Sequence, residues 1–226
     1  MSATRLQFEE ELEQLRHRLL EMGSEVDTML GSAITALIEQ DVKLAKEIIR
    51  RDDRVDSMDI QIETDCMRLI ALQQPLARDL RLIGTALKVI TDLERIGDLA
   101  VGIAKISRKL AQTTFLQPLV DIPRMAISVR EMLKAALSAF VHHDLVAVDK
   151  VVASDDEVDD LFHQIRDELH ICMQRDPAVV VQASYLLFVA HYLERVADHT
   201  VNIAERVYYV ETGHLAQRVQ NHQSQN

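Results

Sequence analysis

The sequence of 226 residues contains few of the amino acids that interrupt regular structure. It has six glycines, four prolines, two cysteines and no tryptophan, and aromatic residues make up only 4% of it. A β-sandwich needs turn residues about every ten positions, so this composition excludes that fold class. Two cysteines cannot form a disulfide framework in a chain of this length. We therefore expect Cys66 and Cys172 to be buried, unreactive thiols.

Long apolar runs are also missing from the sequence. No run approaches the roughly 18 residues that cross a bilayer, and residues 1–10 soon become acidic instead of forming a secretion signal. Acidic residues outnumber basic ones by 36 to 25, which gives a formal net charge of −11. This charge disfavours nucleic acids and anionic membranes as main ligands, because both bind basic surfaces. We expect a cytoplasmic protein that attracts cations.

The abundant residues favour helices. Hydrophobic residues make up 48% of the chain, which is enough for a core, and Ala, Leu, Glu, Gln, Arg and Met are good helix formers. Aspartate caps and prolines mark the later helix starts, at Asp41, Pro75, Asp121, Asp144 and Asp176. The sequence predicts six helices, over residues 4–40, 42–73, 75–111, 121–142, 144–174 and 177–212.

The two halves of the chain repeat each other. Leu93–Asp98 (LERIGD) aligns with Leu193–Asp198 (LERVAD), and Asp52–Asp56 (DDRVD) aligns with Asp155–Asp159 (DDEVD). Two copies of a three-helix unit with short connections should fold as up-down-up bundles. The predicted fold is all-α, with two tandem, pseudo-symmetric three-helix bundles of six long antiparallel helices. The expected boundaries are 1–113 and 118–213 for the bundles and 214–226 for a flexible polar tail.

Two carboxylates, four residues apart, interrupt the same apolar stripe in each repeat. Positions i and i+4 lie side by side on a helix, and two partly buried like charges need a proton, an arginine or a bound cation to compensate them. A hairpin of the second and third helices would bring further aspartates level with each pair. The sequence thus predicts two acidic clusters, Glu94, Asp98, Asp52 and Asp56 in the first half and Glu194, Asp198, Asp155 and Asp159 in the second.

Clustered oxygen ligands without thiols suit a hard cation such as Mg²⁺, Mn²⁺ or an iron ion better than a structural zinc ion. The alternative is that Arg54, Arg95 and Arg195 neutralise the acids as ordinary salt bridges. The chemistry of the residues leaves both interpretations open, and the duplication favours a metal. His191 and His199 flank only the second acidic pair, so we expect them to lie at the surface or behind the ligands. For His142 and His143 we expect a solvated loop.

Three longer strings resemble the PhoU family of phosphate-transport accessory regulators, and the resemblance covers essentially the whole chain. They are Pro75–Arg81 (PLARDLR), Leu93–Asp98 and Leu193–Glu205 (LERVADHTVNIAE). The resemblance implies that the two Glu/Asp pairs bind metal. It also implies a cytoplasmic, often dimeric adaptor without enzymatic activity, which damps phosphate uptake and the phosphate-starvation response. The implied partners are the ATPase subunit of a phosphate ABC transporter and a sensor histidine kinase, with only peripheral association with membrane complexes.

A di-iron carboxylate enzyme is the alternative from a different functional class. Such enzymes draw a Glu-x-x-His motif from two helices of a four-helix bundle. Neither Glu94 nor Glu194 is followed by histidine three residues later, so the motif is a poor fit. The repeat is also imperfect, because Asp59 aligns with Phe162 and no counterpart of Asp79–Arg81 follows Pro177. The two clusters can therefore differ in affinity.

Overall fold

A computed structural model describes residues 3–111 and 121–214 of the chain. Within these ranges the chain is almost entirely helical, as predicted. Its elements are α1 (Ala3–Ile38), α2 (Val42–Gln73), α3 (Ala77–Leu110), α4 (Asp121–His142), α5 (Leu145–Arg175), the short 3-10 helix η1 (Pro177–Val179) and α6 (Val180–Thr212). The linker before Pro118 and the tail after residue 214 lie outside the described residues.

Aspartate caps begin α2 and α5 in the same way. The Asp41 carboxylate accepts hydrogen bonds from the backbone N–H groups of residues 43 and 44 at 2.8 and 3.0 Å. Asp144 accepts the equivalent bonds from residues 146 and 147 at 2.9 and 3.1 Å. The residue before each cap, Gln40 or His143, has a positive φ of 53° or 58°, which turns the chain back on itself. These two helix starts are confirmed, and the repeat extends to the turns.

The turn before α3 differs from the prediction. Pro75 was expected in the first turn of the helix, but α3 begins only at Ala77. Gln74 ends α2 in the left-handed conformation, and the reversal of the chain needs the residues between it and Ala77. At the other hairpin Asp176 caps η1 through the N–H of residue 178, and Pro177 is its first residue, so the start near 177 is confirmed there.

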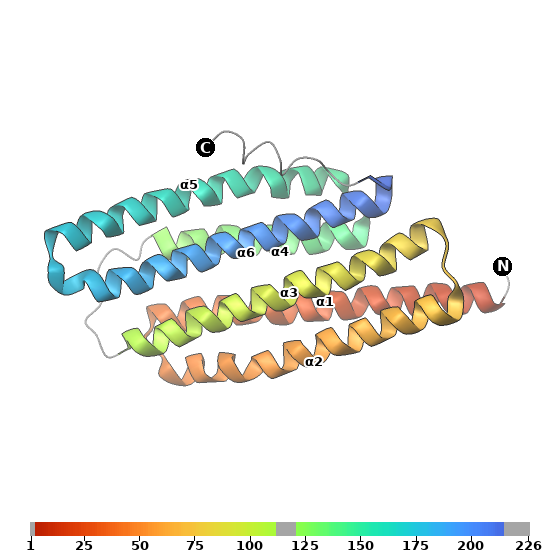
Figure 1. Cartoon of the computed structure of the whole chain (residues 1–226), viewed down its shortest axis with the longest axis horizontal. Coiled ribbons are helices and arrows are strands. Elements are labelled where there is room, and N and C mark those ends of the chain that lie inside the picture. Colours follow the sequence, from red (N-terminus) through yellow and green to blue (C-terminus); the bar gives the residue numbers. More distant parts are fainter. Residues whose placement is uncertain (1–2, 112–120, 215–226) are drawn as a thin grey trace.

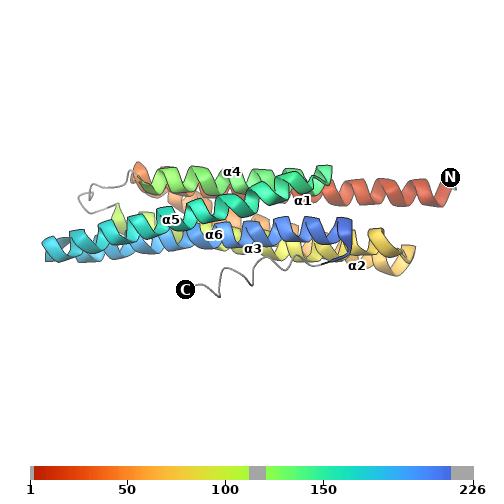
Figure 2. The same cartoon turned by 90° about the horizontal axis from the view of Figure 1, so that it is seen from above.

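The helices form two layers. Helices α5, α6, α3 and α2 lie side by side in this order, and α4 and α1 cover one face of the layer (Figures 1 and 2). Helix α1 packs on α2 and α3, and α4 packs on α5 and α6, so each half is a three-helix bundle. Among the helices of residues 3–111 and 121–214, none covers the opposite face of α3 and α6 (Figure 2). The prediction of two tandem bundles is confirmed.

Pseudo-symmetry extends to the packing of the core. Residues 91–101 of α3 and 191–201 of α6 show the same order of buried, half-buried and exposed side chains. On α2 and α5 the buried positions repeat with a spacing of 103 residues, in the pairs Ala45/Val148, Ile48/Val151, Val55/Val158, Ile62/Ile165 and Cys66/Leu169. Cys66 is therefore buried, as expected. Cys172 is only half-buried, because it lies in the last turn of α5.

The two halves meet along antiparallel pairs of helices. Asp92 of α3 lies against His199 of α6, and Gly102 of α3 lies against Tyr192 of α6, so the numbering runs in opposite directions. A Cβ on Gly102 would lie 2.8 Å from the Tyr192 ring. The missing side chain therefore allows the ring to approach the backbone of α3 closely.

Ionic contacts also join the halves. Asp27 of α1 accepts two hydrogen bonds from Arg130 of α4, at 2.7 and 2.9 Å. Near the end of α6, Glu211 accepts hydrogen bonds from Arg78 at 2.8 and 3.1 Å and lies 2.8 Å from His143. The expectation of a solvated loop is thus wrong for His143, because the turn before α5 packs against the end of α6. Arg81 adds a hydrogen bond to the carbonyl oxygen of residue 210.

The contact between Asp27 and Arg130 can be tested by mutation. Arg130→Met removes both hydrogen bonds and leaves a carboxylate that is only 14% exposed, with the Lys134 ammonium 3.5 Å away. We expect the free energy of unfolding in urea to fall by about 1–3 kcal/mol. Lys134→Met should cost less than about 1 kcal/mol, because that side chain is 61% exposed. Equal losses in the two variants would contradict this ranking.

Two acidic clusters as candidate metal sites

The α2–α3 hairpin brings the predicted carboxylates of the first half together. Asp52 lies close enough to Asp56 and Asp98 for their charges to act on it, and partial burial is the main cause that raises its pKa. Burial also raises the pKa of Glu94, with smaller contributions from Asp98, Asp59 and Asp56. The predicted hairpin register is therefore right. Four carboxylates of this half influence one another across the seam between two helices.

Part of this charge is compensated within the first half. Arg95 lies between the acidic pair, with Nε 3.3 Å from Glu94 and Nη1 3.1 Å from Asp98. Lys105 lowers the pKa of Asp52. Arg54 pairs instead with Glu25 of α1, at 3.3 Å. The salt-bridge interpretation therefore holds for Arg95 and fails for Arg54, whose partner is not in the predicted set.

The second half repeats the cluster between α5 and α6. Asp159 and Asp198 both have raised pKa values, chiefly because burial desolvates their carboxylates and then because the negative charge of Glu194 is near. Asp155 is half-buried on α5, one turn before Asp159. Each of the four positions has the same exposure as its counterpart in the first half: Glu194 and Asp155 are half-buried like Glu94 and Asp52, and Asp198 and Asp159 are exposed like Asp98 and Asp56.

The basic side chains around the second cluster are mostly histidines. His191 Nδ1 lies 2.7 Å from Glu194 Oε2, and His163 lowers the pKa of Asp159. Arg195 also lowers the pKa of Asp198, yet within residues 3–111 and 121–214 it forms no ion pair like that of Arg95. The clusters thus share their acids and differ in the groups that compensate them.

The sequence analysis missed the roles of two residues near the clusters, Asp59 and His199. Asp59 belongs to the first cluster: its pKa is raised by burial, Glu63 and Asp56, and it acts in turn on Glu94. Its position one turn after Asp56 was the available signal. His199 does not serve the second cluster alone, because its Nδ1 lies 2.9 Å from Asp92 of α3. It is chiefly a contact between the halves.

The carboxylate oxygens of the acidic clusters are suitable ligands for a hard cation, but their positions in this structure do not form a complete coordination shell. Their predicted ligands are all carboxylates, and the pKa values of Asp52, Glu94, Asp159 and Asp198 are raised first by burial and then by the neighbouring carboxylates. In the side-chain positions of this structure, no three histidine, cysteine, aspartate or glutamate side chains of the described residues are grouped closely enough to hold a metal ion. A bound cation would require some carboxylates to turn, and Asp56, Asp98, Asp159 and Asp198 are exposed enough to do so.

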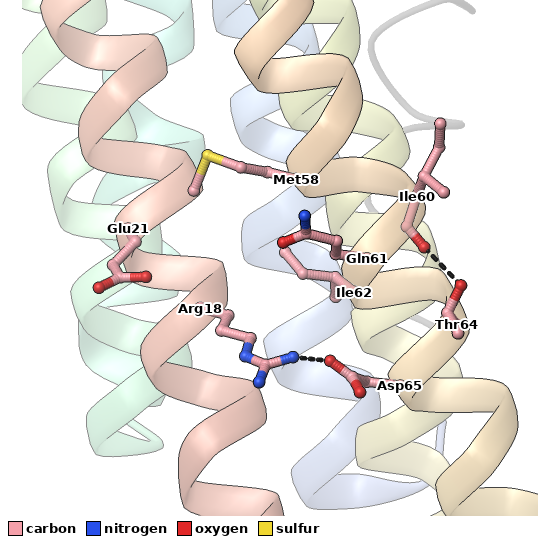
Figure 3. A pocket seen from close by; sticks show the side chains of 8 residues that line it. All are labelled: Arg18, Glu21, Met58, Ile60, Gln61, Ile62, Thr64 and Asp65. Carbon is pink, nitrogen blue, oxygen red and sulfur yellow. Dashed lines mark hydrogen bonds and ion pairs between the residues drawn. The ribbon is translucent and has the colours of Figure 1, made fainter.

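An open hollow of about 390 Å³ lies between α1 and α2 (Figure 3). The Arg18–Asp65 ion pair spans the two helices at its edge, and Met58 reaches across toward α1 (Figure 3). None of the residues around it belongs to the predicted metal set. The hollow therefore does not include any of the predicted metal ligands.

Comparison with known proteins agrees with this architecture. The PhoU domain matches residues 19–107 and again residues 122–207. The chain belongs to the PhoU family. It is 42% identical to the phosphate-specific transport system accessory protein PhoU homolog of Clostridium acetobutylicum, over 93% of this chain and 96% of that one. Identity to the homolog of Aquifex aeolicus is 39%, over 91% and 93% of the two chains.

Solved structures of PhoU proteins have the same fold. The crystal structure of PhoU from Pseudomonas aeruginosa has a TM-score of 0.88 and 35% sequence identity, and the match covers 92% of this chain and all of that one. The phosphate transport system regulatory protein PhoU from Streptococcus pneumoniae has a TM-score of 0.87 and 30% identity, covering 93% and 99%. No helix in the described part of this PhoU-family chain has the length and hydrophobicity to cross a membrane.

The raised pKa values predict how the stability of the metal-free protein depends on pH. Well below the ordinary carboxyl pKa of about 4, both the folded and the unfolded states are protonated. As the pH rises, the unfolded chain releases its protons first, so each raised pKa of Asp159 and Asp198 lowers stability until the folded pKa has been passed. We expect Asp159→Asn and Asp198→Asn to gain stability relative to wild type between about pH 4 and pH 7.

Urea unfolding in EDTA at a series of pH values would measure this gain. The relevant quantity is the difference in unfolding free energy between each variant and wild type, because other titrating groups then cancel. A difference that stays constant from pH 4 to pH 7 would contradict the desolvation of these two carboxylates.

Proposed function

We propose that this PhoU-family protein is a metal-binding regulatory adaptor that restrains phosphate uptake and the phosphate-starvation response. Its relatives are named as accessory proteins of the phosphate-specific transport system. The proposed partners are the ATPase subunit of a phosphate ABC transporter and the sensor histidine kinase of a phosphate two-component system. The adaptor is proposed to act in the cytoplasm by occupying its partners, as a homodimer and without catalysing a reaction.

The observation that carries the metal-binding part is the duplication of one acidic cluster in two packed bundles. Because α3 and α6 are antiparallel, with Asp92 beside His199, the Glu94/Asp98 and Glu194/Asp198 pairs lie at nearly the same level of the molecule. Repetition of four carboxylates with matching exposure is unexpected for scattered surface charge. The hypothesis assigns each cluster one hard cation, Mg²⁺, Mn²⁺ or an iron ion, held by carboxylate oxygens.

When bound, such a cation would offset the mutual repulsion of the acids and hold the two helices of each hairpin together. The first site would draw on Glu94, Asp98, Asp52 and Asp56, and the second on Glu194, Asp198, Asp155 and Asp159. In the first site the cation would compete with Arg95, which already contacts both members of the pair. A rigid body with two such sites suits an adaptor that contacts two partners.

Metal binding predicts a cation-dependent gain in stability. A ligand that binds only the folded state adds about 2.7 kcal/mol at a hundredfold excess over its Kd. We expect millimolar Mn²⁺ or Mg²⁺ to raise the melting temperature of chelator-treated protein, measured by differential scanning calorimetry. The quadruple variant Glu94→Gln, Asp98→Asn, Glu194→Gln, Asp198→Asn should fold without metal and lose most of this gain.

Sodium chloride at equal ionic strength controls for simple screening of the acidic surface. If wild type and the quadruple variant respond equally to Mn²⁺, the cation does not act through the paired acids. If the divalent ions do no more than sodium chloride, the clusters are ordinary solvated or salt-bridged acids.

The regulatory role predicts a phenotype in the cell. Deleting the gene should derepress a phosphate-starvation reporter at high phosphate, because the signal needs the adaptor to occupy its partners. Wild type should restore repression, and the quadruple variant should restore it less well at equal protein level. A deletion strain that stays repressed at high phosphate contradicts the adaptor role, whereas full rescue by the variant contradicts only a role of the clusters in signalling.

A further inference from the structure

Two histidines lie beside the second acidic cluster, one on each helix of the α5–α6 hairpin. His163 follows Asp159 by four residues on α5, and its ring partly offsets the effect that burial has on the pKa of that carboxylate. His191 precedes Glu194 by three residues on α6, and its Nδ1 lies 2.7 Å from Glu194 Oε2. Residues three or four apart share one face of a helix. Each helix therefore presents an imidazole together with a carboxylate of the cluster.

The side chain of Phe162 shows that the two imidazoles are close to each other across the hairpin. Its ring centroid lies 5.7 Å from that of His163 and 6.1 Å from that of His191. Both histidines therefore lie beside the same aromatic ring. Both are also exposed, which leaves each imidazole room to turn toward the carboxylates.

The internal repeat provides a comparison for these side chains. The first half has different residues at the three equivalent positions, in the pairs Ile60/His163, Thr91/His191 and Asp59/Phe162. The members of each pair have the same exposure, so the packing of the bundle does not require an imidazole at either place. The first cluster therefore offers oxygen atoms alone, with Arg95 across its acidic pair. The second cluster adds two imidazole nitrogens and has an apolar ring where the first has a fifth carboxylate.

Nitrogen and oxygen ligands together suit a different class of cation from oxygen ligands alone. Imidazole suits Zn²⁺ and Ni²⁺, whereas carboxylates without imidazole suit Mg²⁺ and Mn²⁺. Zn²⁺ is usually four-coordinate, and its protein ligands are thiolates, imidazoles and carboxylates. The side chains of Asp159, His163, His191 and Glu194 supply four such ligands from one hairpin. They are not grouped around one point in the described side-chain positions, so binding requires the exposed imidazoles to turn.

We propose that His163 and His191 are ligands that make the second cluster a site for Zn²⁺ or a similar borderline divalent ion. This inference rests on the proposed function, which assigns a cation to each cluster, and it specifies which kind of cation the second cluster prefers. The imidazoles bind the ion through nitrogen, and Asp159 and Glu194 supply the negative charge that compensates it. Because the first cluster lacks these nitrogens, the two halves of the chain differ in the cation that they prefer.

Isothermal titration calorimetry of the chelator-treated, full-length protein with Zn²⁺ measures what the imidazoles contribute. The double variant His163→Gln, His191→Gln should weaken the tightest Zn²⁺ site at least about tenfold, because losing even a residue behind the ligands often costs that much. Its Mg²⁺ binding should stay close to that of wild type, since Mg²⁺ uses the carboxylates. The control His142→Gln, His170→Gln removes two exposed histidines outside the cluster and should leave Zn²⁺ binding unchanged.

Nuclear magnetic resonance of the imidazole nitrogen nuclei tests ligation directly. The signals of His163 and His191 are identified as those missing from the spectrum of each single glutamine variant. In wild type both sets should shift when Zn²⁺ is added, and an equal concentration of Mg²⁺ should not move them in the same way. A purely structural role of the two rings would not produce this difference between the ions.

The outcomes separate this inference from the proposed function. Equal Zn²⁺ affinity in wild type and the double variant, or imidazole signals that stay in place, overturns the histidine ligands and leaves the paired acids standing as a site for hard cations. Zn²⁺ binding that survives undiminished in Asp159→Asn, Glu194→Gln places the ion outside the cluster and also overturns the inference. If wild type binds neither Zn²⁺ nor Mn²⁺, the metal-binding part of the proposed function fails as well. Circular dichroism melting curves in EDTA confirm that each variant is folded.

Discussion

The antiparallel packing of α3 against α6 is the contact on which the functional surfaces depend. It brings the third helix of each repeat to the centre of the molecule, where each has a hairpin partner on its outer side (Figure 1). Because the two helices run in opposite directions, their equivalent motifs come to the same level instead of lying far apart. The two helices can approach closely only where the side chains between them are small or planar, as where the Tyr192 ring packs on Gly102. The hydrogen bond between Asp92 and His199 also joins the two helices.

The two halves of the chain share the acidic residues of the clusters but differ in the basic residues that contact them. The four carboxylates of each half have matching exposures, but Arg95 bridges the first pair whereas His191 contacts the second. The arginine is a permanent cation with five N–H donors, whereas the imidazole ring offers only two nitrogen atoms. The two clusters therefore present different neighbouring groups to a cation, although the order of buried and exposed positions around them is the same. The two halves differ at a further position as well, where Asp59 lies beside the first cluster and Phe162 is the equivalent residue of the second half.

Most of the fold could be predicted from the sequence, because its signals are local. The caps of Asp41 and Asp144 act through backbone groups two and three residues away, so the sequence is sufficient to locate them. The register of each hairpin follows from the short turn and the helical rise, which is why Asp52 and Asp98 were correctly paired. Pro75 and His143 were misread for a common reason: each lies in a turn whose conformation depends on packing and chain reversal, not on the nearest residues.

The sequence by itself determined the helical class, the internal repeat and the positions of the paired acids, since each depends on periodicity or on residues within one hairpin. Tertiary structure decided which arginine compensates which carboxylate, because Arg54 and Arg95 are equally close to the acids in sequence but only Arg95 points toward its pair. It also decided that His199 joins the halves and that Lys109 of α3 lies over the Tyr185 ring of α6. Those contacts join residues about 75 to 110 positions apart, and only the packing of α3 on α6 brings them together.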